Sequence, residues 1–131
     1  MSKQTANKNA VTTNPLSADE RRRSPRVAGE IPLKIRYADY DIIGQTQDIS
    51  AIGTYCTLNK YIPPFSVISI ILLLPLKNES KTIIANLRCR GVVVRSNSSP
   101  NENKQYEIAI YFNRLRESDR SKLSKYVQQF L

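Results

Sequence analysis

The sequence predicts an all-β fold: a six-stranded antiparallel barrel with a C-terminal α-helix packed on it. Two patterns carry this prediction. From residue 30 onward, apolar and polar side chains alternate with a period of two, as in strands with one buried face. The end of the chain changes to the 3.6-residue period of a helix. The 131 residues, 40% of them hydrophobic, are enough for one domain but not for two independent cores.

Six segments carry the strand pattern, at residues 30–37, 42–49, 53–58, 67–74, 82–96 and 105–112. The fourth, Val67 to Leu74, is an almost continuous apolar run closed by Pro75, which indicates burial on both faces or a covering element. The fifth is long enough to need a bend, and Gly91 is its expected site.

The two ends of the chain differ in character. The first 18 residues are polar and hold too little apolar surface to offset the entropy of ordering, so we expect a disordered arm over 1–18 and the folded domain over 19–131. A helix is expected to begin near Ser118, with Asp119 favourably placed at its positive end. Its apolar stripe consists of Leu123, Tyr126, Val127 and Phe130.

Composition excludes several functions. The chain has no histidine, so it lacks the pairs used by serine and cysteine hydrolases, a histidine base and a histidine-ligated zinc. Cys56 and Cys89 lie far apart without a CxxC spacing, which excludes a thiolate metal cluster. We therefore expect no enzyme, no cofactor and no metal. Two free core thiols in a reducing cytosol are the favoured interpretation, although the sequence leaves one disulfide open.

The sequence also lacks the signals of export and membrane insertion. Its first 18 residues contain no apolar core of a signal peptide, and its longest apolar run has eight residues where a spanning helix needs about 20. We expect a soluble, cytoplasmic protein. Lys and Arg number 20 against 11 Asp and Glu, and this net charge of +9 favours an anionic partner: nucleic acid, a nucleotide or a membrane surface.

An arginine cluster precedes the first strand. It contains Arg21, Arg22, Arg23 and Arg26, with Pro25 preventing continuation as a helix. A guanidinium binds phosphate, or O6 and N7 of guanine, with two parallel hydrogen bonds, and its flat face stacks on bases. Taken alone, the cluster favours a solvated basic segment over a binding site.

A second constellation follows the second expected strand. Asp48 and Ser50 lie two residues apart and are expected to face one point in space, where the carboxylate could accept hydrogen bonds from the N1–H and N2 edge of guanine. Gly53 would allow a positive φ or a close approach of the backbone. Taken alone, this pattern is typical of an ordinary polar turn.

The two constellations in order resemble the paired signature of the PilZ domain, Arg22-x-x-x-Arg26 followed by Asp48-x-Ser50-x-x-Gly53. The segments Gly91–Arg95 and Tyr106–Phe112 are similar to the family's later strands. The resemblance covers roughly residues 20–131. It implies a single-domain receptor that binds the bacterial second messenger cyclic di-GMP on the outside of a barrel and relays it, by a change of shape or partner, to motility, pilus, exopolysaccharide or virulence systems.

The resemblance also implies roles for individual residues. Arg22 and Arg26 would grip phosphate and the guanine Hoogsteen edges, Asp48 and Ser50 would hold a guanine from the other side, and Gly53 would keep the turn clear. Arg21, just before the motif, resembles the family's two-ligand mode, so we expect two cyclic di-GMP molecules per chain. Arg95 ranks below these as a contact.

Two alternatives stay open. A nucleic-acid-binding barrel would use the same arginines on phosphates, but such surfaces interleave aromatic side chains, and Tyr55, Tyr106 and Phe112 are better explained as core or barrel wall. The other alternative is an interaction domain that keeps the PilZ fold without its ligand. The downstream protein partner and the oligomeric state are not predicted.

Overall fold

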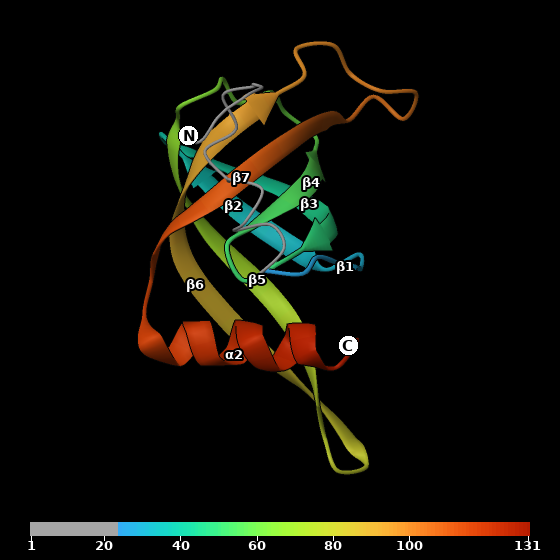
Figure 1. Ribbon diagram of the computed structural model, residues 1–131. Coiled ribbons are helices and arrows are strands. Elements are labelled where there is room, and N and C mark those ends of the chain that lie inside the picture. The colour runs from blue at the N-terminus through green and yellow to red at the C-terminus, as the bar shows by residue number, and fades with distance from the viewer. Residues whose placement is uncertain (1–23) are drawn as a thin grey trace, which may run out of the picture.

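The computed structural model describes residues 24–131 and confirms the predicted barrel and C-terminal helix (Figure 1). Six strands form the wall in the order β3-β2-β5-β6-β7-β4, and the antiparallel pairing of β4 with β3 closes it. The elements are β1 (Val27–Ala28), β2 (Pro32–Tyr37), β3 (Tyr40–Ile49), β4 (Gly53–Leu58), β5 (Val67–Asn78), β6 (Lys81–Ser96), β7 (Tyr106–Leu115) and α2 (Glu117–Gln128).

The short strand β1 was not predicted. It pairs with the end of β3, beyond the stretch that β2 occupies, so β1 and β2 run along β3 as one interrupted strand. The side chain of Thr46 fills the interruption. Its buried hydroxyl accepts a hydrogen bond from the Ile31 N–H at 2.9 Å and donates one to the Gly29 carbonyl. Thr46 thereby satisfies two backbone groups that would otherwise lack a partner inside the protein.

The barrel interior is filled by the alternating residues of every wall strand, with Ile35, Ile49, Leu58, Leu72 and Leu87 among the side chains fully removed from solvent. Cys56 and Cys89 belong to this core, and both are free thiols, which decides the question the sequence left open. Burial raises the pKa of each thiol to about 12. Both cysteines are therefore inert packing groups at neutral pH.

Strand β5 does not end before Pro75, as the sequence had suggested. It continues to Asn78, with Pro75 paired to Ile84 of β6, and the β5–β6 hairpin projects past the helix (Figure 1). The reason is local: β2 pairs only with residues 69–72 of β5, so among residues 24–131 Pro75 has no second neighbour strand that would need its missing N–H. The register of β6 with β7 shifts between Arg90 and Gly91, where the bend was expected.

Helix α2 lies across one end of the barrel against β5 and β6 (Figure 1). Leu123, Tyr126 and Val127 are buried as predicted, but Phe130 lies beyond the last helical residue and is 54% exposed. Asp119, expected only to suit the helix dipole, is fully buried. Its carboxylate accepts hydrogen bonds from the Arg116 side chain at 3.0 Å and from the Arg88 backbone at 3.5 Å.

Candidate functional site

Asp48 faces outward because of an irregularity in β3. Before this point the even-numbered residues Ile42 and Thr46 are buried, and after it the odd-numbered Ile49 is buried. The pairing of β3 with β4 shifts register between Thr46 and Asp48, so the inserted Gln47 reverses the alternation. Without this bulge the carboxylate of Asp48 would point into the apolar core.

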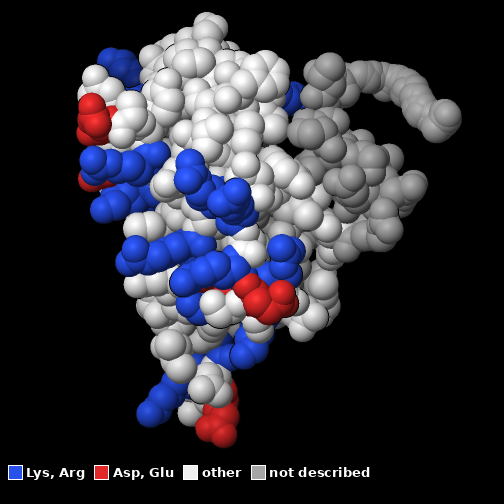
Figure 2. All heavy atoms as spheres, turned by 90° about the vertical axis from the view of Figure 1, so that its left-hand side faces the viewer, with Lys and Arg blue, Asp and Glu red and all other residues white. Residues whose placement is uncertain are grey.

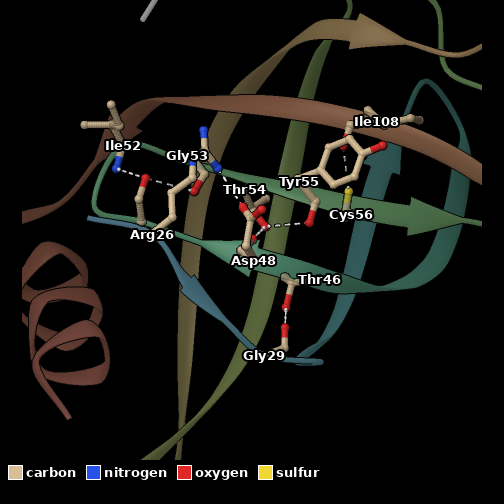
Figure 3. A network of polar contacts seen from close by, with 11 residues as sticks. Arg26, Gly29, Thr46, Asp48, Ile52, Gly53, Thr54, Tyr55, Cys56 and Ile108 are labelled. Carbon is tan, nitrogen blue, oxygen red and sulfur yellow. Dashed lines mark hydrogen bonds and ion pairs between the residues drawn. The ribbon is translucent and has the colours of Figure 1, made fainter. Parts of the chain in front are cut away.

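Arg26 and Asp48 meet at the outer surface (Figure 3). The Arg26 Nη1 atom lies 2.6 Å from the Asp48 Oδ1 atom, and the two side chains are 36% and 33% exposed. Arg26 immediately precedes β1, whose Ala28 pairs with Asp48, so the backbone pairing brings the two motifs together across 22 residues of sequence. The two motifs were visible in the sequence, and the structure shows that one residue of each contacts the other.

Ser50 occupies a different position from the one its spacing suggested. It follows the last residue of β3, where the period of two no longer applies, and it is only 1% exposed. Its hydroxyl donates to the Gly53 carbonyl and accepts from the Ile52 N–H, both at 3.3 Å. In this conformation Ser50 closes the β3–β4 turn and does not share the outward direction of Asp48.

Close packing, and not a positive φ angle, requires glycine at position 53. A Cβ atom at this position would lie 2.4 Å from the Ile110 carbonyl oxygen of β7. Its φ angle is not in the left-handed region. Gly53 therefore lets β4 approach β7 directly beside the turn, and the Phe112 N–H donates to the Ile52 carbonyl at 2.9 Å to hold that turn on β7.

The register places further polar residues next to Asp48. Asp48 pairs with Tyr55, Tyr55 with Ala109, and Ala109 with Arg95. These four residues form one row across the outside of the barrel, about 14 Å long at the usual strand spacing. The sequence motifs did not reveal Tyr55 and ranked Arg95 below the other contacts; strand pairing brings Tyr55 beside Asp48 and puts Arg95 at the far end of the row.

The electrostatics of this row centre on Tyr55. Burial raises the pKa of its hydroxyl, and the neighbouring Glu107 carboxylate raises it further. Arg95 acts in the opposite direction. The phenol is therefore a neutral hydrogen-bonding group at physiological pH. A half-buried ring in this position also offers an apolar face between a carboxylate and a guanidinium.

Arg21 and Arg22 lie outside the described residues, so the structure places only Arg26 of the arginine cluster. The described part of the chain, residues 24–131, contains no group of three or more His, Cys, Asp or Glu side chains that could hold a metal ion. Within the same residues, no helix has the length and apolar character needed to cross a membrane.

The protein is thus a small antiparallel barrel that carries the Arg26–Asp48 ion pair on its outer surface, beside the β3–β4 turn. The family model of the PilZ domain matches residues 20–129. The chain belongs to the PilZ domain family. No curated protein matches the sequence.

Two solved structures share the fold. The inhibitor of motility MotI/DgrA of Bacillus subtilis is 17% identical with a TM-score of 0.65, and the match covers 83% of this chain and 50% of that one. The PilZ domain of Escherichia coli YcgR, solved with c-di-GMP, is 12% identical with a TM-score of 0.57, and the match covers 83% and 90%. This chain thus corresponds to half of the Bacillus protein and to nearly the whole of the YcgR domain.

Proposed function

We propose that the protein is a receptor for cyclic di-GMP, which binds on the outer face of the barrel at Arg26, Asp48 and the β3–β4 turn. Membership of the PilZ family and the likeness to the YcgR domain, which was solved with this ligand, support the proposal. The observation that carries it is the Arg26–Asp48 pair. These two side chains come from the family's two separate motifs and meet at a partly exposed position.

The pair offers complementary chemistry to a guanine nucleotide. The guanidinium can bind a phosphate, or O6 and N7 of guanine, and the carboxylate can accept from N1–H and N2–H₂ of the same base type. Before binding, each group partly neutralises the other. Binding would replace this ion pair by ligand contacts on both side chains. Because the pair is partly exposed to solvent, breaking it costs little free energy.

Ser50 and Gly53 contribute to the proposed site through the turn. The Ser50 hydroxyl bonds within the turn, and Gly53 permits the close approach of β7. Both hold the backbone that follows Asp48, so we assign them the role of fixing the position of that carboxylate and of leaving the turn free of side-chain bulk.

The row that continues from Asp48 extends the proposed surface. Tyr55 would offer its ring to a guanine face, Ala109 leaves space beside it, and Arg95 would meet a phosphate or a second base at the far end. Arg21 and Arg22, which closely precede Arg26 in the sequence, would complete the set of cations. The ligand carries two phosphates, and two molecules carry four, which is why three or more arginines favour two molecules per chain.

The proposed output is a change of partner in the bacterial cytoplasm. Ligand binding would change the exposed surface around Arg26, and a separate protein would recognise the new surface. Motility, pilus function, exopolysaccharide synthesis and virulence are the processes that membership of the family suggests.

Amide chemical shifts during a titration with cyclic di-GMP test this proposal. We expect the largest changes at Arg26, Asp48, Tyr55 and Arg95, and small changes at the far end of α2. A single-stranded RNA serves as the comparison. If RNA reproduces the same changes at equal concentration, or if the nucleotide shifts only residues remote from Asp48, the proposed site is wrong.

A further inference from the structure

A second arginine cluster lies on the barrel wall, apart from the β3–β4 turn. Arg90 of β6 pairs directly with Arg114 of β7. Arg88 lies two residues along β6, on the same face as Arg90, and both are exposed. Arg116 follows at the end of β7. Figure 2 shows Lys and Arg side chains gathered on this side of the molecule, with few acidic side chains among them.

The arrangement is electrostatically unfavourable for the isolated chain. Like charges directly opposite each other on neighbouring strands repel, and Arg90 and Arg114 are in that position. Within residues 24–131, neither they nor Arg88 form a salt bridge. The nearby carboxylate of Asp119 is buried and already paired with Arg116 and Lys122. An external anion would relieve this repulsion.

The cluster surrounds a groove. A cavity of about 490 Å³ is bordered by the four arginines together with Ser69, Ile70, Ile71, Cys89 and Leu115. Strand pairing puts Ser69 and Ile71 of β5 on the same outer face as Arg90 and Arg88. The groove therefore has guanidinium groups at its edge, with the small side chain of Ser69 and the apolar side chain of Ile71 between them. We call it the basic groove.

We propose that the basic groove binds an acidic, extended segment of a partner protein. The groove crosses β5, β6 and β7, about 10 Å at the usual strand spacing, which is the length of about three extended residues. Two carboxylates on alternate residues would each meet a guanidinium fork, the geometry in which arginine binds most strongly. An apolar residue between them in the same alternate series, which faces the same way, would pack on Ile71.

The shape and lining favour a protein segment over other anions. The charges border a groove that also contains Ile71, so an acidic protein segment can make an apolar contact as well as ion pairs. No aromatic side chain borders the groove among the described residues, which leaves nucleic-acid bases without a stacking platform. This inference is independent of the proposed nucleotide site, because none of the groove residues belongs to the Arg26–Asp48 cluster.

The test measures binding of a fluorescein-labelled peptide, Glu-Glu-Leu-Glu-Glu, by anisotropy in the absence of cyclic di-GMP. The wild-type protein should bind it at least about tenfold more tightly than the Gln-Gln-Leu-Gln-Gln peptide. The double variant Arg90→Gln/Arg114→Gln should lose roughly tenfold in affinity. Its thermal midpoint should equal or exceed that of the wild type, since the repulsion is removed, and this separates lost binding from lost folding.

Two controls make the result specific. Lys104→Gln/Lys125→Gln removes the same charge from exposed positions outside the groove and should retain binding. Arg26→Ala should also retain it, whatever becomes of nucleotide binding. The proposal is overturned if the Lys variant loses as much affinity as the Arg variant, or if the two peptides bind equally. It is also overturned if the Arg variant loses binding only to phosphatidylserine vesicles or to single-stranded RNA.

Discussion

Asp48 is the residue on which the proposed nucleotide site most depends, and the inserted Gln47 directs its side chain outward. Its carboxylate lies 2.6 Å from Arg26 while a third of the side chain stays in contact with solvent. Ion pairs in such positions add little to stability, because water screens them and the side chains lose entropy in forming them. The pair is thus better suited to recognition than to holding the fold.

Replacement of Asp48 by alanine tests this distinction. We expect Asp48→Ala to reduce cyclic di-GMP affinity more than tenfold, because a charge-assisted contact worth about 2 kcal/mol is lost. Stability should change by less than about 1 kcal/mol. Calorimetric titration and urea unfolding measure the two quantities. A variant that loses its folding free energy along with its binding would show that the pair is structural.

At the scale of elements, the junction between β1 and β2 sets the position of Arg26. The Thr46 hydroxyl serves the Ile31 N–H and the Gly29 carbonyl at once. Thr46→Val keeps the shape and removes both bonds, so we expect a loss of about 2 kcal/mol or more in the free energy of unfolding. Because β1 follows Arg26 directly, ligand affinity should fall as well.

Thr57→Val is the matched control for this prediction. Thr57 is also buried, but its hydroxyl accepts only a long contact of 3.4 Å from the Gln47 side chain. Urea unfolding should therefore show a smaller change for it. Equal losses in the two variants would contradict the role assigned to Thr46.

Helix α2 is attached to the barrel partly through Asp119. Burial by itself raises the pKa of this carboxyl, but the hydrogen bonds from Arg116 and the Arg88 backbone, with the charge of Lys122, outweigh it and lower the pKa. A carboxyl with a lowered folded-state pKa stabilises the protein above its unfolded pKa of about 3.9. That contribution is lost as the pH falls through the folded value.

Asp119→Asn should remove this dependence. We expect the variant to be about 2 kcal/mol less stable at pH 7 and to approach the wild type in stability as the pH falls below 4. Thermal unfolding of both proteins between pH 2 and 7 measures this difference in stability. Parallel curves for the two proteins across this range would contradict the assignment.

The strand and helix patterns were readable from the sequence because one buried face imposes a period on the chain. The exceptions have physical causes that a single strand does not reveal. Pro75 is tolerated because no strand among the described residues pairs with β5 on that side at this point, and the Gln47 bulge depends on the pairing of β3 with β4. The short strand β1 is joined to β2 by a junction that Thr46 of β3 stabilises through its hydroxyl. Its two residues are too few for a periodic signal.

The candidate site was predicted only where its residues form a recognisable motif. Arg26, Asp48 and Gly53 stand in motifs, and their types indicate their chemistry. The buried, turn-closing position of Ser50 could not be read from a spacing of two, because the strand ends at Ile49. Tyr55 and Arg95 join the site only through cross-strand register.

At the scale of the whole molecule, two separate surfaces present arginine side chains. One lies at the β3–β4 turn with Arg26, and the other is the basic groove around Arg90 and Arg114. We propose that the first senses the nucleotide and the second holds a partner protein. One barrel would then be able to bind both the signal and its target.

The number of nucleotides bound is a property of the whole surface. We expect two cyclic di-GMP molecules per chain, with Arg21→Leu shifting the ratio towards one without abolishing binding, because a third guanidinium offsets the repulsion among four phosphates. Analytical ultracentrifugation monitored at the nucleotide absorbance gives the ratio at saturation. A wild-type ratio of one would contradict this prediction.

The central claim is that the Arg26 site, and not the overall positive charge, binds cyclic di-GMP. Isothermal titration of the wild type, Arg26→Ala and Arg114→Ala tests it most directly, because both variants lose one exposed arginine and only the first lies at the site. We predict low-micromolar or tighter binding by the wild type and Arg114→Ala, and a loss of more than about tenfold in Arg26→Ala, as for one charge-assisted contact of about 2 kcal/mol. Equal affinities for the two variants would contradict the account.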